Sequence, residues 1–350
     1  MNYKFFVFIP VFAFLSFFSL ECTPSKDGGV FLSLNGGNSW QQKVFVSKKV
    51  NIAVLNVLTI KIDPQNSKII YLGSKDSGLW KSLDGGEVWY QLVDTNKALN
   101  NRANVYSISI DPKNTNNIYI GVYQDKYGRF LRSRDAGRSW QEVYVTSRQA
   151  YAVFATAVDS YDPSVVYMGT AEGGFLKSLD YGSSWRVIKW FDDVITDIKI
   201  NPRDTRMVYL STLADGIFKT TDKGETWQSL KENLKDFREA DKVETLIIDP
   251  QNPNILYSGS EYGLLKTLDG GQTWQKVNII IPPQTLPILS VVVDPTNNDH
   301  IYYGAGSVVY RSLDGGKNWN LYPLPSSRQV KAITIDQSNP NIIYIGMNNK

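Results

Sequence analysis

The chain has 350 residues, enough for two average domains, and its 37 basic and 34 acidic side chains give a formal charge of only +3. No run of like charge reaches five residues, so the basic surface of a nucleic-acid-binding protein is absent and no nucleic-acid partner is predicted. A single histidine, His300, and a single cysteine exclude an intrachain disulfide and argue against a His-ligated metal or a histidine-based catalytic centre. Neither a metal nor another cofactor is predicted.

The first 21 residues are typical of a signal peptide. One lysine precedes an almost unbroken apolar run from Phe5 to Leu20, a length that is short for a membrane-spanning helix. Cys22 follows directly and resembles the lipid-acceptor cysteine of a bacterial lipoprotein, although Glu21 stands where a small residue is usual. We therefore expect a signal peptide over 1–21, a tether over 22–29 and a membrane anchor through lipid on Cys22. Release after secretion and an uncleaved anchor are the alternatives.

After the tether, the chain contains only two candidate strands, in "GVFLSLN" (29–35) and "WQQKVFV" (40–46), before a longer pattern begins. In that pattern "VLTIKID" (57–63), "IIYLGS" (69–74), "LWKSL" (79–83) and "WYQLV" (89–93) are short β-type segments separated by Asp-, Asn-, Pro- and Gly-rich turns. We label the four strands of such a unit A to D. Six complete units follow one another, and the chain ends with two further strands in "VKAITID" (330–336) and "NIIYIG" (341–346).

Four short antiparallel strands in each unit of about 45 residues predict an all-β, seven-bladed propeller that forms one domain over 30–350. Its seventh blade would combine strands C and D from the N-terminus with strands A and B from the C-terminus. Such closure removes the open sheet edges, so a monomer is expected.

A phrase of the form Ser/Thr-x-Asp-x-Gly-x-x-Trp recurs seven times, always between strands C and D. Its acidic position is occupied by Asn35, Asp84, Asp135, Asp180, Asp222, Asp269 and Asp314. A carboxylate in such a turn accepts backbone N–H groups, the glycine permits positive φ, and the tryptophan can pack under the turn. A structural role is therefore predicted for all seven.

The phrase resembles the Asp-box, or BNR, repeat, and the resemblance covers about 28–350. Similar repeats occur in sialidases, sortilin/Vps10 receptors, xyloglucan hydrolases and photosystem II assembly and stability factors. The resemblance implies a propeller whose Asp-boxes lie away from the active face. It does not determine the function, because one fold carries many functions.

The A–B and C–D turns should share one face of the ring, which leaves the variable B–C and D–A loops on the other face. Five B–C loops carry a carboxylate that would form either an acidic ring or ordinary turn contacts: Asp76, Asp125, Glu172, Asp215 and Glu261. Aromatic residues in or beside these loops would bind a sugar ring or a peptide, or else pack locally: Tyr123, Tyr127, Trp190, Phe191 and Tyr262.

Three functions remain open from the sequence. The first is a non-enzymatic scaffold for a protein partner at the cell envelope, in which Arg132 and Arg134 would form a binding patch or merely face solvent. The second is a glycoside hydrolase that pairs Asp192 or Asp193 with Glu172 or Asp215. The third is a module that binds a glycan or peptide without turnover. The scaffold is the preferred interpretation.

Overall fold

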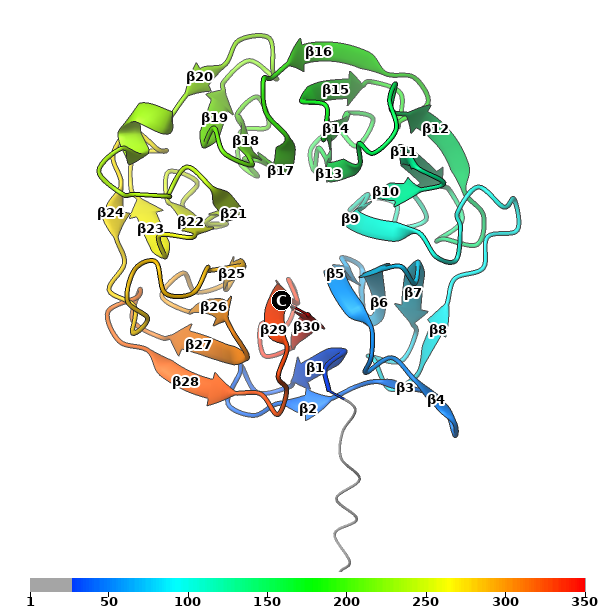
Figure 1. Cartoon of the computed structure of the whole chain (residues 1–350), viewed down its shortest axis with the longest axis horizontal. Helices are drawn as coiled ribbons and strands as arrows, with labels where there is room; N and C mark the ends of the chain where they lie inside the picture. The colour runs from blue at the N-terminus through cyan, green and yellow to red at the C-terminus, as the bar shows by residue number, and fades with distance from the viewer. Residues whose placement is uncertain (1–26, 350) are drawn as a thin grey trace, which may run out of the picture.

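The computed structural model describes residues 27–349, which form seven four-stranded antiparallel sheets around a central channel (Figure 1). The predicted signal peptide, Cys22 and the predicted tether up to residue 26 lie outside the described residues. Within the described range, no helix is long and apolar enough to cross a membrane.

Each sheet is one blade, with strand A nearest the channel (Figure 1). Blades 1 to 3 comprise β5 (Asn56–Asp63), β6 (Asn66–Lys75), β7 (Leu79–Ser82), β8 (Trp89–Gln91); β9 (Asn104–Ile110), β10 (Ile118–Gln124), β11 (Tyr127–Ser133), β12 (Gln141–Val145); and β13 (Val153–Val158), β14 (Val166–Thr170), β15 (Gly174–Ser178), β16 (Arg186–Trp190). Blades 4 to 6 comprise β17 (Ile195–Ile200), β18 (Val208–Thr212), β19 (Ile217–Thr220), β20 (Gln228–Ser229); β21 (Val243–Ile248), β22 (Leu256–Ser260), β23 (Leu264–Thr267), β24 (Gln275–Lys276); and β25 (Ser290–Val293), β26 (Ile301–Ala305), β27 (Val308–Ser312), β28 (Asn320–Pro323).

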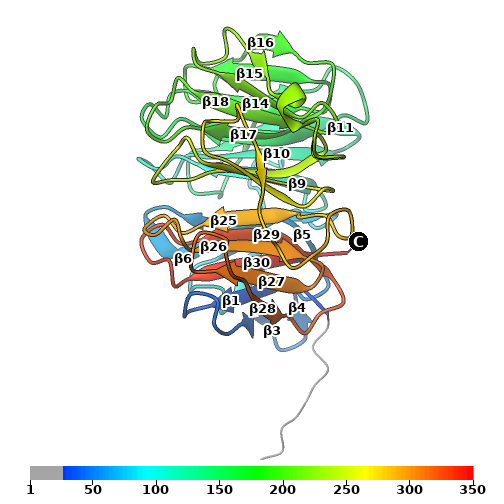
Figure 2. The ribbon, with the colours of Figure 1, turned by 90° about the vertical axis from the view of Figure 1, so that its left-hand side faces the viewer.

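Blade 7 joins the two ends of the chain in the order β2-β1-β30-β29. Its strands are β1 (Val30–Ser33), β2 (Gln41–Gln42), β29 (Gln329–Ile335) and β30 (Ile343–Asn348). Val30 pairs with Gly346 and Ser33 with Ile343, so an N-terminal strand completes a sheet begun at the C-terminus. The predicted seven-bladed ring and its mode of closure are both confirmed, and Figure 2 shows the resulting disc from the side.

Every Asp-box makes the local contacts that its sequence predicts. In blade 4 the Thr220 hydroxyl donates to the Asp222 carboxylate at 2.6 Å, and the same carboxylate accepts the backbone N–H and the hydroxyl of Thr226. These hydroxyl and amide donors hold the pKa of Asp222 at about 2. Gly224 has a φ of +99°, and a Cβ there would lie 3.6 Å from the ring of Trp227, which packs beneath the turn. The box therefore fixes its own hairpin without a ligand.

Adjacent blades are linked through these boxes by a tyrosine on strand B. The Tyr71 hydroxyl of blade 1 donates to the Ala136 carbonyl in the box of blade 2, and Tyr209 of blade 4 donates to Gly270 in the box of blade 5. Lys81 on the neighbouring strand C donates to the same Ala136 carbonyl at 2.9 Å. One turn carbonyl thus receives a phenol and a cation from the preceding blade. Basic residues occupy this strand C position in six blades, namely Lys81, Arg132, Lys177, Lys219, Lys266 and Arg311.

Strand B also carries a glycine wherever the next blade approaches most closely. A Cβ on Gly73 of blade 1 would lie 2.5 Å from the carbonyl oxygen of Val105, on the first strand of blade 2. Between blades 7 and 1, a Cβ on Gly346 would lie 2.3 Å from the Val57 side chain. Blade 4 departs from the pattern and has Ser211, whose hydroxyl bonds to Thr196. Close inter-blade packing therefore explains the repeated "Y-x-G" of strand B.

One element of the structure differs from the sequence prediction. The segment "WQQKVFV" was expected to be a single strand, but β2 ends at Gln42 and the chain then forms a separate hairpin, β3 (Phe45–Ser47) and β4 (Val50–Asn51). The hairpin projects from the rim between blades 7 and 1 (Figure 1). β2 has two residues, as have the outer strands β20 and β24, and the 13-residue connection Lys43–Leu55 between β2 and β5 contains the hairpin.

Candidate functional site

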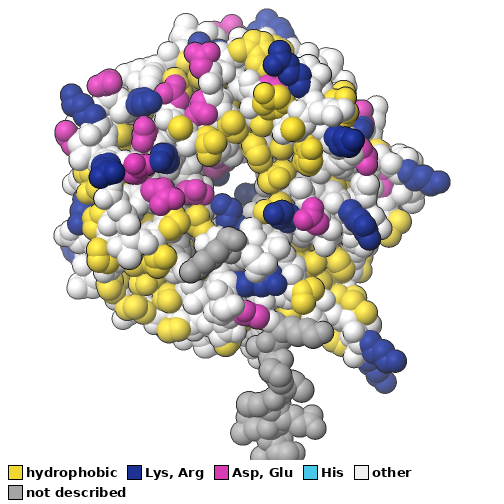
Figure 3. Space-filling view, in the orientation of Figure 1, with side chains coloured by type: hydrophobic (Ala, Val, Ile, Leu, Met, Phe, Trp, Pro, Cys, Tyr) yellow, Lys and Arg dark blue, Asp and Glu magenta, His cyan; other side chains and the backbone are white. Residues whose placement is uncertain are grey.

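The variable B–C and D–A loops lie together on the face that Figure 3 presents, and acidic and basic side chains are mixed across it. The five predicted loop carboxylates do not form a free acidic ring. Glu172 accepts the Ser147 hydroxyl and the Arg148 N–H, and Asp215 pairs with Lys231 at 2.7 Å. Asp125 accepts the Asn100 side-chain amide, whereas Asp76 and Glu261 are exposed and have no ion pair within residues 27–349. Only these last two remain available to a ligand.

The carboxylates considered for hydrolysis are placed by the fold in structural contacts. Asp193 caps the neighbouring B–C loop by accepting the N–H groups of Ala214 and Asp215, at 2.6 and 2.9 Å. Glu172 and Asp215 are engaged as described above. Asp192 is exposed, and no contact with a second carboxylate is seen within the described residues. The geometry thus assigns structural roles to three of the four candidates.

The predicted aromatic residues do not form one platform. Trp190 is 53% exposed at the end of the outer strand of blade 3, but Phe191 is only 7% exposed and packs edge-on against Phe218 and Trp227. Of the two roles left open for Phe191, local packing is therefore the one observed, because its ring fills the gap between blades 3 and 4. Tyr262 packs against Phe237 at 5.3 Å.

The two remaining tyrosines, Tyr123 and Tyr127, flank the B–C turn of blade 2 and are half-buried. The Tyr127 hydroxyl accepts a hydrogen bond from the Gln149 side chain. They lie on a different blade from Trp190 and Tyr262. The predicted aromatic residues therefore do not form a shared ligand-binding surface.

Arg132 and Arg134 have different environments. Arg132 is buried and donates to the Tyr181 carbonyl, the Ser183 hydroxyl and the Gln141 side chain, so it belongs to the link between blades 2 and 3. Its burial lowers the pKa of the guanidinium without removing its charge. Arg134 is exposed and lies on the Asp-box face. The structure therefore accounts for Arg132 without a ligand, and only Arg134 remains accessible.

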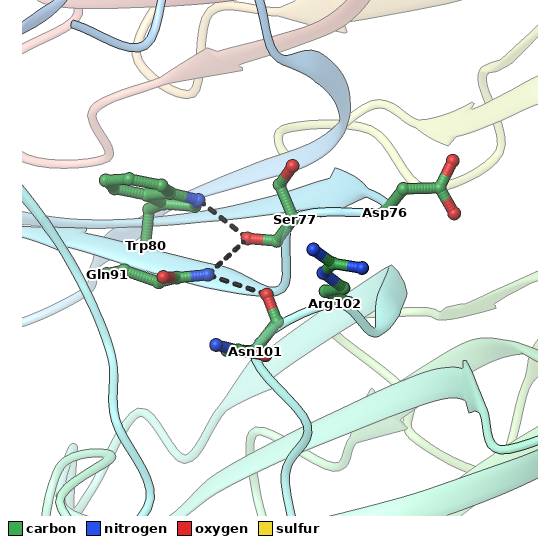
Figure 4. A pocket seen from close by; sticks show the side chains of 6 residues that line it. All are labelled: Asp76, Ser77, Trp80, Gln91, Asn101 and Arg102. Atoms are coloured by element: carbon green, nitrogen blue, oxygen red, sulfur yellow. Dashed lines mark hydrogen bonds between the residues drawn. The ribbon is translucent and has the colours of Figure 1, made fainter. Parts of the chain in front are cut away.

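A cleft of about 610 Å³ lies on the variable face of blade 1, lined by Asp76, Ser77, Trp80, Gln91, Asn101 and Arg102 (Figure 4). The Trp80 indole N–H and the Gln91 amide both donate to the Ser77 carbonyl, at 2.8 and 2.9 Å. Gln91 also donates to the Asn101 carbonyl at 2.7 Å, which joins the B–C loop to the D–A loop. These bonds fix the aromatic wall of the cleft in one orientation.

The charged groups of this cleft are unpaired. No ion pair involves the Asp76 carboxylate or the Arg102 guanidinium within the described part of the chain, and both side chains are exposed. Asp76 is held in a left-handed conformation, with φ of 56°, while its backbone N–H donates to Asn104. A fixed indole with one free anion and one free cation can bind an extended peptide or a sugar by stacking and charge-assisted hydrogen bonds.

Two buried polar residues hold the D–A loop that forms one side of the cleft. The Asp94 carboxylate accepts the N–H groups of Ala98 and Leu99 and, from the next blade, that of Trp140 at 2.9 Å. The Gln124 side chain accepts the Asn100 N–H and donates to the Ala98 carbonyl. The loop over 94–104 is therefore tied into the fold, and its Arg102 is presented from a fixed backbone.

The central channel carries a second group of charges, on the innermost strands. Lys199 pairs with Asp197 at 2.8 Å, and Lys331 pairs across the channel with Glu244 at 3.4 Å. Lys61 is accessible to solvent within the channel but has no ion pair in the described residues. The surrounding walls and the nearby Lys199 lower its pKa to about 8. Within the described residues, no three His, Cys, Asp or Glu side chains are grouped so as to hold a metal ion.

Sequence reasoning identified Asp76 but missed Trp80, Gln91 and Arg102. Trp80 was counted as part of a regular strand, and Arg102 lies in a D–A loop for which no site residue was predicted. One signal was available, because Trp80 is one of only two tryptophans outside the Asp-boxes.

The repeat geometry, the ring closure and the comparisons with known proteins agree on the class of fold. Residues 183–333, less than half of the chain, match the family model "Photosynthesis system II assembly factor YCF48". The chain is an Asp-box, or BNR-type, propeller. No curated protein matches this Asp-box propeller in sequence.

Several solved structures have a similar fold. The xyloglucanase of family GH74 from Xanthomonas campestris superposes with a TM-score of 0.70 at 16% identity, over 84% of this chain and 51% of that enzyme. YCF48 from Cyanidioschyzon merolae superposes with a TM-score of 0.62 at 16% identity, over 83% of this chain and 95% of that protein. A structure described as YCF48 bound to D1 peptide gives 0.63 at 15% identity, covering 83% and 92%.

These similarities show the fold alone, because every identity is below 25%. The chain spans about half the length of the GH74 enzymes, which include one from Niastella koreensis that is covered to 53%. The YCF48 structures are instead covered almost completely.

Proposed function

We propose that this Asp-box propeller is an exported, membrane-tethered scaffold that binds an extended segment of a protein partner. The observation that carries the proposal is the blade 1 cleft, whose lining combines a fixed Trp80 with the unpaired charges of Asp76 and Arg102. The partial match to the assembly-factor family and the peptide carried by one similar structure support a peptide as the ligand. The N-terminal sequence supports export and an anchor at Cys22.

The cleft is better suited to bind a peptide than to hydrolyse a glycoside. Trp80 provides an apolar surface, Arg102 can bind a carboxylate or a backbone carbonyl, and Asp76 can accept an amide or pair with a basic side chain. Asp76 is the only carboxylate among the lining residues, whereas general acid–base hydrolysis of a glycoside uses two. The hydrolase alternative therefore has no specific support from this site.

Binding can be tested with the full chain and fluorescently labelled peptides, beginning with a D1 peptide and peptides tiled over any protein cross-linked to the chain in its own membranes. We expect Trp80→Ala and Arg102→Glu each to weaken peptide binding by about tenfold or more, the range for truncation of an interface anchor. Trp190→Ala, which removes the other tryptophan outside the Asp-boxes, is the control and should leave the affinity unchanged.

Equal losses in the Trp80 and Trp190 variants would contradict the assignment of the cleft. Xyloglucan oligosaccharides form a second arm of the same titration. Binding of these sugars with no binding of any peptide would favour the glycan-binding alternative, and product release from them would favour the hydrolase.

A further inference from the structure

The hairpin formed by β3 and β4 presents exposed cations and apolar side chains together. Lys48 and Lys49 occupy its tip and are exposed, without an ion pair in the described residues. Phe45 and Val50, on either side of the tip, are 48% and 50% exposed. A shallow hollow of about 480 Å³ runs along the same segment. The tip therefore presents two cations beside two apolar side chains on a hairpin that projects away from the ring (Figure 1).

The base of this hairpin is rigid and lies against the first described residues. Ile52 is fully buried and donates its N–H to the Val44 carbonyl at 2.9 Å. The Gly28 carbonyl accepts the Gln42 side chain at 2.7 Å, and a Cβ on Gly29 would lie 2.7 Å from Val44. The chain thus enters the ring along the base of the hairpin. Cys22 precedes Asp27 by five residues, which span at most about 18 Å when extended.

We propose that the β3–β4 hairpin docks on an anionic lipid surface, with Phe45 and Val50 in the headgroup region and Lys48 and Lys49 against lipid phosphates. The inference rests on the membrane tether of the proposed function. A tether at Cys22 would hold the ring near the bilayer, where a basic and apolar hairpin can bind the headgroup region directly. Each lysine close to an anionic surface strengthens binding by roughly fivefold.

The geometry favours lipid over a protein as the occupant. The hairpin contributes five strand residues and a two-residue tip, whereas a stable protein interface uses about 20–30 residues on each side. Its charges have one sign, which complements an anionic membrane, and it adjoins the point where the tether enters. Docking here would bring the rim of the ring to the bilayer.

Trypsin cleavage tests the proposal on the full chain, with its own N-terminal segment, reconstituted in vesicles. Lys48 and Lys49 are the reporter sites, and Lys126, exposed in the β10–β11 turn, is a matched lysine at another hairpin tip. In vesicles with about one-third anionic lipid, we expect cleavage after Lys48 and Lys49 to slow by roughly tenfold relative to neutral vesicles, while cleavage after Lys126 is unchanged. Mass spectrometry of the early fragments measures both rates.

The double variant Phe45→Ser/Val50→Ser retains both cleavage sites and should lose most of this protection without a change in melting temperature. Equal cleavage at the hairpin and at Lys126 on anionic vesicles overturns the proposal, as does protection that appears only when envelope proteins are added. Flotation of the same vesicles separates the two claims. A chain that does not float refutes the tether, whereas a chain that floats with an unprotected hairpin refutes the docking alone.

Discussion

The hydroxyl of Tyr344 donates a hydrogen bond to the carbonyl of Gly85, 2.9 Å away, and so ties blade 7 to the Asp-box of blade 1. We expect Tyr344→Phe to lower the free energy of unfolding by about 1 kcal/mol, because the substitution removes the donor to a part-buried carbonyl. Urea denaturation measures the loss. Tyr167→Phe is the control, since the buried Tyr167 hydroxyl has no partner in the described structure and its removal should cost nothing. Equal losses would show that the phenol–carbonyl bond does not contribute.

The glycine of strand B provides a second prediction. Gly73→Ala should lower the free energy of unfolding by about 1–3 kcal/mol, because the new methyl group would lie 2.5 Å from the Val105 carbonyl and force blades 1 and 2 apart. Ser211→Ala, at the same register position in blade 4, loses only the bond to Thr196 and should cost less. Chemical denaturation of both variants makes the comparison, and a tolerant Gly73→Ala would contradict the packing account.

Substitution of Arg132 and of Arg134, both in blade 2, should affect stability to different extents. Arg132→Met is expected to destabilise the chain by about 2 kcal/mol, because it leaves the Tyr181 carbonyl without one of its donors and removes a charged donor from Gln141 and Ser183. Arg134→Met should change stability by less than about 0.5 kcal/mol. Melting temperatures test both. A charge reversal at Arg132 would therefore report on folding, and only Arg134 is suitable for testing a surface patch.

Acid should lower the stability of the fold by protonating the Asp-box carboxylates. Hydroxyl and amide donors hold the pKa of Asp222 and Asp314 at about 2 in the folded chain, below the value near 3.9 expected after unfolding. A carboxylate whose pKa is lowered by folding stabilises the fold above the unfolded value, and that contribution is lost as the pH falls from about 4 towards 2. Urea midpoints at pH 7, 4 and 3 should decline in that order.

Asp222→Asn tests the origin of this decline. The first box already uses Asn35, whose side chain accepts the Ser39 N–H and donates to the Ser39 hydroxyl, so an amide can serve in the turn. The variant should fold at neutral pH and show a shallower loss of stability in acid. An unchanged acid dependence would mean that other carboxylates control it.

The sequence was sufficient for the architecture because each blade repeats the same local rules. The Asp-box turns, the A–B turns and the alternating strands depend on residues within a few positions of one another, and the shared seventh blade followed from the half-units at the two ends. The same local regularity misled the interpretation of "WQQKVFV", since nothing near Gln42 marks the point where the blade strand ends and the hairpin of Phe45 and Val50 begins.

The cleft was harder to predict because contacts between distant residues create it. Asp94 must reach Trp140, and Gln124 must reach Asn100, before Arg102 is placed opposite Trp80. The same limitation applies to the lysine or arginine that precedes the Ser/Thr of six boxes. Its recurrence is visible in the printed sequence, but in five of the six blades its partner is a carbonyl in the following blade.

The pairing of Val30–Ser33 with Ile343–Gly346 has a consequence for the order of events during synthesis. The first strand leaves the ribosome about 300 residues before its partner exists, a delay of roughly 15–60 s at ordinary elongation rates. Throughout that interval β1 has an unpaired edge, which is the part of a sheet most prone to associate with other chains. Completion of the ring must therefore be among the last steps of folding. Loss of the final strands would leave β1 unpaired and the ring open.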